Sequence, residues 1–429
     1  MSKKSIIALS SICILCILAS TFVTVNNLKG FVTDKVFDDY KIELLFNKPI
    51  EHSIFSPGDF VFKDVSVKNE GKEILKIGKI VVKSHLLSLI KKKIIVDGIY
   101  VEDFYLSINA TDQKKLTEKI KSKKKLTKKN IDDEHIPEAI EFSINSFVLK
   151  NINLKYQKEI QINNLNLISK IDNKKITLDS LSLNSFGGEY KMDGNLFYGD
   201  KPFKADVQGS YSKIDLSLFN HFLKSQKKSL KGNLSFDYNL KWQDDKAMKP
   251  EGNFHARAKK LTLSGINIDK LLEGFIDSRE VGALDIASYM TLGPLGALVT
   301  NSLESSKSLL GLNSGTSKFT HINIKTEFND GIANLSDVAF STKENRVSVA
   351  GKINLNKKIF KNFFVYILNK KGCARILQRV SGSLLEPDIG VTQTISEGVI
   401  SPVTDLLKKT KELVDCKPVY RGVVKHPET

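Results

Sequence analysis

The four cysteines are the residues with the clearest chemical potential in this 429-residue chain. Cys13 and Cys16 have the C-x-x-C spacing of redox and metal sites, but they lie in an uncharged apolar stretch and have no exposed thiolate role there. Cys373 and Cys416 lie in the last third of the chain. They are candidates for a disulfide if the body of the protein lies in an oxidising compartment, and two buried free thiols are the alternative.

Other catalytic or metal-binding patterns are absent from the sequence. The seven histidines are scattered and have no metal-ligand spacing. There is no HExxH, GxSxG or GxGxxG motif, and GLNSGTSK at residues 311–318 lacks the Gly-Lys-Ser/Thr ending of a phosphate-binding loop. We therefore expect no catalytic residue, no metal, no cofactor and no enzymatic activity.

The N-terminus predicts a membrane anchor. Residues 6–25 carry no charge and no proline, and a helix of this length crosses a hydrocarbon core of about 30 Å. Lys3 and Lys4 precede the stretch and acidic residues follow it from Asp34, so the short end should stay in the cytoplasm. A cleaved signal peptide is the alternative. We expect one uncleaved span within residues 1–29 and a body on the far side of the membrane.

The charge balance favours anionic partners. Lysine and arginine outnumber aspartate and glutamate by 65 to 48, a formal net charge of +17. Phospholipid headgroups, lipopolysaccharide and nucleic acid are such partners, and a solvated lysine-rich surface is the alternative. Because the anchor would place the body outside the cytoplasm, we expect no nucleic acid partner. The lysine-rich residues 113–136 are either a solvated insert or a contact with an anionic membrane.

A repeated six-residue phrase predicts how the strands are shaped. The phrase is apolar, two polar or small residues, apolar, any residue, apolar, and it occurs at residues 62–67, 144–149, 149–154, 162–167, 178–183 and 263–268. A half-buried strand alternates with a period of two, so each phrase would turn the apolar set outward unless the strand bends or bulges there. We interpret the phrase as a strand that bends and keeps one face apolar. Hairpins with two-residue turns are the alternative.

The fold class follows from these strands. We expect a mainly β protein whose long curved antiparallel sheet forms an open apolar groove, with an N-terminal transmembrane helix and a few capping helices. The predicted parts are the anchor at 1–29, a β region at 30–112, the lysine-rich insert at 113–136, a central β-groove at 137–268, a helical cap region at 269–316, a C-terminal β region at 317–390, and an amphipathic helix with a tail at 391–429. Membrane insertion is the alternative role for the cap region.

Four stretches of the last third carry a family resemblance. They are VGALDIASYMTLGPLGALVTNSL, FSTKENRVSVAGKINL, KKGCARILQRVSGSLLEPDI and CKPVYRGVVKHPE, in this order. Together they resemble the C-terminal part of AsmA-family proteins, most specifically over residues 275–429, and the anchor and first strands resemble the family more loosely. The resemblance implies a Gram-negative inner-membrane protein with its body in the periplasm. It also implies kinship with bridge-like lipid-transfer proteins, which have a long apolar β-groove.

The resemblance and the strand pattern together predict passive transfer of phospholipid for outer-membrane biogenesis. Phospholipids and the inner membrane are then partners, and outer-membrane biogenesis proteins are candidate partners. The alternative is a non-enzymatic periplasmic scaffold or regulator of outer-membrane protein assembly that carries no lipid. The candidate groove-lining residues, which would face either lipid or a closed core, are Val96, Val101, Phe104, Leu106, Ile108, Ile144, Leu149, Leu165, Leu167, Leu181 and Leu183.

Overall fold

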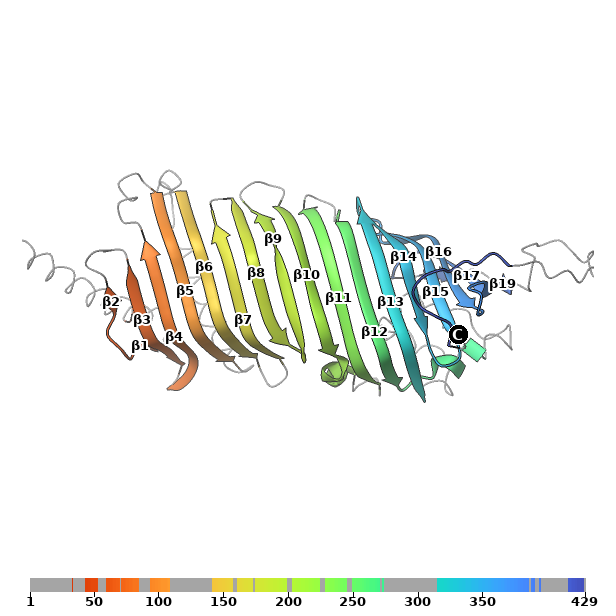
Figure 1. Ribbon diagram of the computed structural model, residues 1–429, viewed down its shortest axis with the longest axis horizontal. Coiled ribbons are helices and arrows are strands. Elements are labelled where there is room, and N and C mark those ends of the chain that lie inside the picture. The colour runs from red at the N-terminus through yellow and green to blue at the C-terminus, as the bar shows by residue number, and fades with distance from the viewer. Residues whose placement is uncertain are drawn as a thin grey trace, which may run out of the picture. The chain divides into compact units, whose positions relative to one another are not determined.

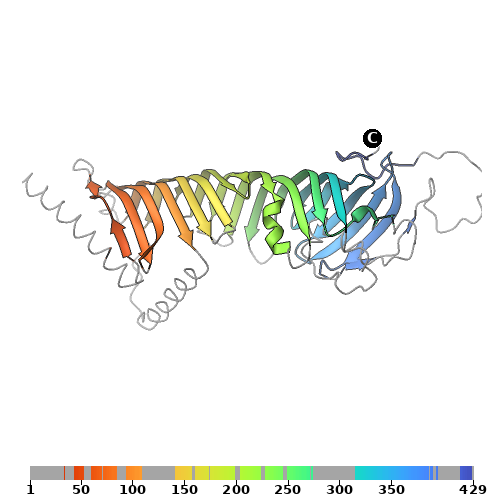
Figure 2. The same cartoon turned by 90° about the horizontal axis from the view of Figure 1, so that it is seen from below.

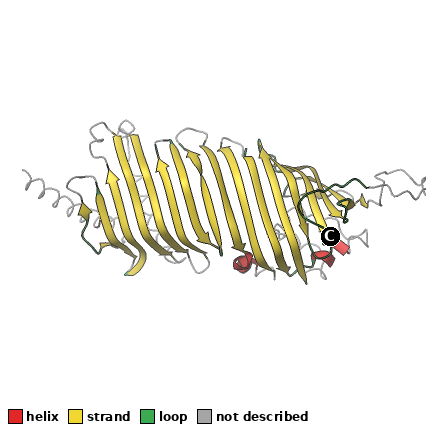
Figure 3. Ribbon diagram, viewed as in Figure 1, coloured by secondary structure: helices red, strands yellow, loops and turns green. Residues whose placement is uncertain are grey.

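The structure is a computed structural model and is mainly β (Figure 1; Figure 3). It describes residues 33, 43–52, 59–69, 71–84, 93–108, 141–156, 160–172, 174–198, 203–223, 228–244, 249–270, 272–273, 315–385, 387–389, 393–394 and 416–427. The predicted anchor, the lysine-rich insert, most of the cap region and the C-terminal amphipathic helix lie outside these residues. No helix in the described part is long and apolar enough to cross a membrane. The chain divides into two compact units, Met1–Ser185 and Phe186–Thr429, and this boundary falls inside the predicted central groove.

The first unit contains strands β1 to β8. They are β1 (Glu43–Phe46), β2 (Glu51–His52), β3 (Phe60–Asn69), β4 (Lys72–Ser84), β5 (Lys93–Ile108), β6 (Glu141–Tyr156), β7 (Ile160–Ile171) and β8 (Lys175–Ser185). Both β1 and β2 pair with β3, and β3 to β8 pair in chain order. The prediction of a purely antiparallel sheet is wrong at β5–β6, which is parallel. A parallel pair needs a crossover of a dozen or more residues, and residues 109–140 supply that length.

The second unit is an antiparallel meander. Its strands are β9 (Gly188–Phe197), β10 (Phe203–Asp215), β11 (Ser229–Asp244), β12 (Glu251–Ser264), β13 (Thr316–Asn329), β14 (Ile332–Ser341), β15 (Arg346–Asn354), β16 (Ile359–Leu368), β17 (Ala374–Gly382), β18 (Pro387–Ile389) and β19 (Gln393–Thr394). The elements η2 (Leu216–Phe219) and α3 (Asn220–Leu223) link β10 to β11. Strands β9 to β17 pair in order, and β18 and β19 pair with β17. The expected mainly antiparallel β fold with few helices is confirmed.

The polar breaks in the strands are bends, as the sequence predicted. Asp64, Asp103, Asn151 and Asn164 each occupy such a break and have φ of 51, 56, 55 and 50°. Aspartate and asparagine are the non-glycine residues that adopt this left-handed conformation most readily. The phrases at 144–149 and 178–183 instead coincide with register shifts in the β6–β7 and β7–β8 pairs. Five of the six phrases thus interrupt strands, whereas the prediction is wrong for the phrase at 263–268, because β12 ends at Ser264.

The strand register keeps the apolar side chains on one face through a bend. Val101 pairs with Ile80, and Phe104 pairs with Ile77, so β4 and β5 take the same three-residue step together. An ordinary strand would have placed residues three apart on opposite faces. The aligned bends cancel this reversal, and the sheet retains one apolar side.

A row of amide side chains joins the bends of β5, β6 and β7. Asn151 Nδ2 donates to Asp103 Oδ1 at 2.6 Å, and Asn151 N–H donates to Asn166 Oδ1 at 3.1 Å. The N–H of Asn164 donates to Asn153 Oδ1 at 3.2 Å. A bend removes backbone groups from the ladder, and these side chains satisfy two of them.

The apolar face of the second unit closes into a core at its C-terminal strands. Phe319, Phe363 and Val365 are 1%, 1% and 2% exposed, and all belong to one buried cluster. Ile266, directly after β12, belongs to the same cluster and is 1% exposed. In Figure 2 the blue strands of this part run at an angle to the green ones. The sheet and the segment after β12 together exclude water from this region.

The described start of the predicted cap region packs on this core. Leu272 is 1% exposed. The carboxylate of Asp269 accepts hydrogen bonds from Thr342 Oγ1 and from Asn345 Nδ2, the latter at 2.9 Å. These bonds hold the described residues at the start of this region against the core.

A C-terminal strap, residues 416–427, lies against the ends of β14 and β15. Tyr420 Oη donates to Asp337 Oδ1 at 2.7 Å, and Arg346 Nη1 donates to the carbonyl of Val424 at 3.2 Å. Burial raises the pKa of Tyr420, so its phenol remains a donor at neutral pH. Val424 is 1% exposed, which makes the strap part of the folded unit.

Cys373 and Cys416 form a disulfide that fixes the start of this strap. Their Cα atoms are 6.1 Å apart, and 43 residues separate them in sequence. Of the two alternatives that the sequence left open, the structure has the bonded pair.

Substitution of Asn151 tests the bend. Asn151→Val and Asn151→Gly both lose the side-chain hydrogen bonds, but only valine opposes positive φ. We expect Asn151→Val to be less stable than Asn151→Gly by about 1–2 kcal/mol, although valine is the better strand former. Urea unfolding of the full chain measures the difference. A valine variant as stable as the glycine variant would contradict the left-handed bend.

Removal of the disulfide tests the anchoring of the strap. The Cys373→Ser variant should be less stable than the wild type by up to about 4 kcal/mol under oxidising conditions, because the unfolded chain gains loop freedom. Under reducing conditions the two proteins should unfold at nearly the same urea concentration. A wild type whose stability does not respond to reductant would show that the bond is absent.

Candidate functional site

The predicted lining residues form rows across the first unit. In one row Val101 pairs with Leu149, Leu149 with Leu167, and Leu167 with Leu181. Ile80 of β4 extends this row, because it pairs with Val101. Directly opposed side chains on one face lie about 4.5–5.5 Å apart. The row is therefore a continuous apolar track from β4 to β8.

Two further predicted positions lie in parallel rows. Leu106 pairs with Leu75 on one side and with Leu154 on the other. Val96 pairs with Ile144, and these two side chains are 9% and 7% exposed. The apolar face thus has several residues along each strand as well as across the strands.

The pairing and side-chain positions of the remaining predicted residues are described less completely. Phe104 and Leu165 pair with apolar residues of neighbouring strands, and Leu183 lies two residues after Leu181 and so on the same face of β8. The side chain of Ile108 lies outside the described residues, although its backbone pairs in β5–β6. The structure brings the described candidates onto one side of one sheet.

The track of the first unit is half-buried, in contrast to the sealed core of the second. Val101, Leu149, Leu167 and Leu181 all keep solvent-accessible area. The buried apolar side chains described in the first unit are few: Val65, Ile74, Val96, Ile144, Ile152 and Leu178. The track therefore keeps apolar surface that is accessible in the folded protein.

The opposite face of the first unit is polar. Lys79 and Glu102 lie 3.7 Å apart, and Lys170 and Asp179 lie 3.6 Å apart. Tyr105, next to Phe104 in sequence but on this other face, is 48% exposed. The sheet of the first unit therefore has one polar, solvent-exposed side and one apolar side.

The sequence predictions missed an aromatic part of the apolar face in the second unit. Tyr190, Tyr211, Phe236 and Phe254 follow one another from β9 to β12, with ring centroids 5.6, 5.8 and 5.7 Å apart. Such separations are typical of favourable aromatic pairs. The alternation in residues 234–242, LSFDYNLKW, is the signal that would have identified this face.

One polar pair lies within the aromatic part. Tyr190 Oη and Tyr238 Oη are hydrogen-bonded to each other, and Tyr190 Oη is 3.1 Å from Met192 Sδ. Burial raises the pKa of Tyr238, and the hydrogen bond with Tyr190 raises it further. The phenol of Tyr238 therefore stays neutral at physiological pH and adds no charge to this face.

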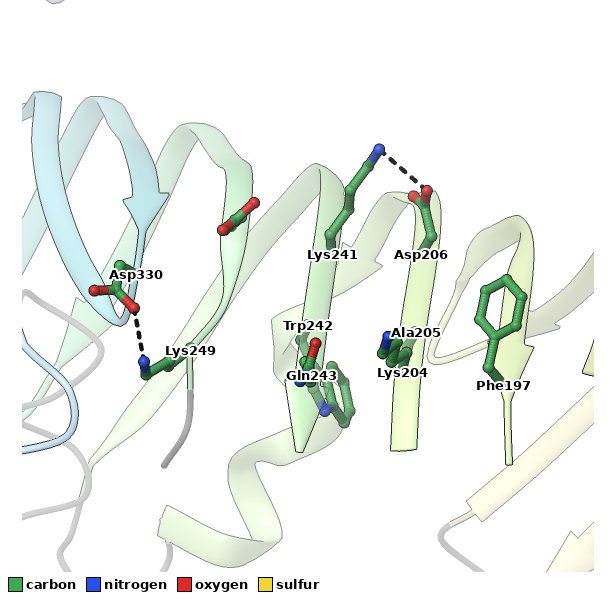
Figure 4. A pocket seen from close by; sticks show the side chains of 10 residues that line it. Phe197, Lys204, Ala205, Asp206, Lys241, Trp242, Gln243, Lys249 and Asp330 are labelled. Atoms are coloured by element: carbon green, nitrogen blue, oxygen red, sulfur yellow. Dashed lines mark ion pairs between the residues drawn. The ribbon is translucent and has the colours of Figure 1, made fainter. Parts of the chain in front are cut away.

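A pocket of about 470 Å³, here called the rim pocket, lies in the second unit where β9 and β11 end and β10 and β12 begin (Figure 4). Lys241 and Trp242 extend from opposite sides of β11 in Figure 4. The Nζ of Lys241 is 3.2 Å from an Asp206 carboxylate oxygen. The lining residues are Phe197, Lys204, Ala205, Asp206, Lys241, Trp242, Gln243, Lys249, Glu251 and Asp330.

Within the described ranges, the structure has no group of three or more His, Cys, Asp or Glu side chains arranged to hold a metal ion. Comparison with known proteins adds no relative, since no family model, no curated protein and no solved structure matches the chain. The AsmA resemblance is thus an expectation from the sequence alone.

Thiol labelling tests the openness of the track. In a full chain with Cys13 and Cys16 replaced by serine, Leu167→Cys should react with a maleimide while the protein is folded. Val365→Cys should react only after unfolding, because Val365 is 2% exposed. Ile168→Cys, on the opposite face at a position 45% exposed, is the positive control. Protection of Leu167→Cys equal to that of Val365→Cys would mean that the track is sealed.

Proposed function

We propose that this chain is an AsmA-like protein that binds phospholipid acyl chains on its apolar face and transfers them passively. The observation that carries the proposal is the half-buried row Val101–Leu149–Leu167–Leu181, which continues across five strands with Ile80. In an ordinary soluble domain, a second layer of helices or strands would bury such a face.

The energetics of transfer support this use of the face. A phospholipid has roughly 30 acyl carbons, and each buried CH₂ is worth about 0.8 kcal/mol, so exposure of both tails opposes transfer by over 20 kcal/mol. An apolar track lowers that barrier along its whole length. Because alkyl contacts are non-directional, neighbouring positions on the track have similar affinity, and the lipid is not trapped at one of them.

The compartment in the proposal is the periplasm of a Gram-negative cell. The uncharged residues 6–25 would hold the chain in the inner membrane, and the disulfide between Cys373 and Cys416 fits an oxidising space. Outer-membrane biogenesis is the process that the resemblance implies, and proteins of that process are candidate partners.

The second candidate function is a periplasmic scaffold without lipid cargo. The observation in its favour is the core of β13 to β17, where Phe319 and Phe363 are each 1% exposed and leave no space for a ligand. The strap next to this core has exposed apolar side chains, Val419 at 46% and Val423 at 66%. A protein partner would suit this end of the second unit, whereas the open track suits a lipid.

Photocrosslinking in cells tests lipid binding. The photoreactive residue p-benzoylphenylalanine in place of Phe104, on the apolar face, should form covalent phospholipid adducts that mass spectrometry detects on the full chain. The same residue in place of Tyr105, on the polar face, should form few. The two positions are adjacent in β5, so expression and membrane attachment are matched. Equal lipid capture at both positions, or none at Phe104, would reject the groove in favour of the scaffold.

A further inference from the structure

The rim pocket contains one cation and one anion whose side chains are not neutralised by any residue in the described part of the chain. Lys241 is paired with Asp206, and Lys249 Nζ is 3.3 Å from Asp330 Oδ1. The side chains of Lys204 and Glu251, by contrast, form no hydrogen bond or ion pair with any residue that the structure describes. Both are exposed. The pocket therefore offers one free charge of each sign, beside pairs that are already satisfied.

Strand pairing fixes the places of these charges. Lys204 of β10 pairs with Phe197 of β9 and with Gln243 of β11, and Glu251 of β12 pairs with Lys241. All these side chains come from the last or first residues of strands. Lys204 and Glu251 thus lie on the ends of paired strands and not in a loop.

A tight turn supplies the far wall of the pocket. Asp330 has φ of 48° and Gly331 has φ of 73°, the two positive values of a two-residue hairpin turn between β13 and β14. The ion pair of Asp330 with Lys249 ties this turn to the residues that precede β12 (Figure 4). The wall is therefore held by both backbone geometry and charge.

The apolar face reaches the same pocket. Trp242 pairs with Ala205, and both lie on the apolar side of β10 and β11, in line with Val207 and Leu240. Trp242 is 44% exposed, and its ring centroid is 6.1 Å from that of Phe203. Tryptophan at the border between an apolar and a polar region is typical of membrane–water interfaces. Lys204 and Glu251 belong to the opposite face, since they pair with Gln243 and Lys241, so the pocket joins the apolar and the charged face at the strand ends.

We propose that the rim pocket holds the headgroup of a zwitterionic, amine-bearing phospholipid. This inference rests on the proposed lipid-binding function. Lys204 pairs with the phosphate, Glu251 accepts from the primary ammonium, and the tails pass Trp242 onto the apolar face. A headgroup with both charges neutralises both free side chains, whereas a purely anionic headgroup leaves Glu251 opposed to like charge. The volume of about 470 Å³ is within the range of small-ligand pockets.

Two crosslinking positions separate this inference from the proposed function. The full chain is reconstituted in vesicles of equal parts phosphatidylethanolamine and phosphatidylglycerol, with p-benzoylphenylalanine in place of either Trp242 or Phe104. We expect capture at Trp242 to be enriched in phosphatidylethanolamine over capture at Phe104. Lipid at Phe104 without enrichment at Trp242 would overturn the headgroup site and leave the groove intact. No lipid at either position would overturn both, and capture of protein at Trp242 would mark a protein interface and overturn the headgroup site.

Charge variants give the second readout. Glu251→Gln should lower the phosphatidylethanolamine enrichment at Trp242 by about threefold to fivefold, the worth of one partly exposed ion pair, and leave phosphatidylglycerol capture unchanged or increased. Lys204→Gln should lower capture of both lipids, because both carry the phosphate. Glu327→Gln and Lys231→Gln, exposed positions on β13 and β11 outside the pocket, are the matched controls. An unchanged lipid ratio in Glu251→Gln would overturn the assignment.

Discussion

The structure depends on keeping one side of a multi-stranded sheet apolar while the strands bend. If a bend shifted the alternation of side chains by an odd number of residues, the leucines after it would face water. The loss of burial would cost about 1.5–3 kcal/mol of folding free energy for each side chain. The first unit avoids this cost because neighbouring strands bend at aligned positions, as Val101 and Phe104 do against Ile80 and Ile77. Left-handed Asp103 and the amide row through Asn151 keep the backbone satisfied at those bends.

The second unit has an apolar face of its own, and the two ends of this face differ. Over β9 to β12 it is covered by half-buried aromatic rings, including Tyr211 and Phe236, which are large and partly wet. Over β13 to β17 it is sealed by sheet curvature and by the segment that begins at Ile266. Packing contacts thus stabilise one end of this unit, while the other end keeps apolar area that a ligand can cover.

Local pattern in the sequence was sufficient for some of this architecture. The bends were predictable because two adjacent polar residues interrupt a period of two, and Asp64 or Asn164 in such a break can take only a few backbone conformations. The row Val101–Leu149–Leu167–Leu181 followed from the same pattern, since a buried face specifies its register strongly. These predictions needed no knowledge of distant contacts.

Other features depend on distant contacts and left no local signal. The parallel β5–β6 pair depends on how the chain returns after Ile108, which periodicity does not encode. Leu167 and Val365 are both apolar strand residues, yet one is half-buried and the other is 2% exposed, because only the second is covered from elsewhere in its unit. Lys204 and Glu251 share a pocket only because the strands that carry them align side by side.

The sealed end of the second unit also limits where a hydrocarbon ligand could move along the apolar face. A hydrocarbon chain that lay across β9 to β11 and moved toward the C-terminus would meet Phe319 and Val347, which are 1% and 0% exposed. These two side chains are closed to solvent and give the hydrocarbon chain no surface to contact. A ligand of the proposed kind would therefore leave this unit over the strand ends and not through the core.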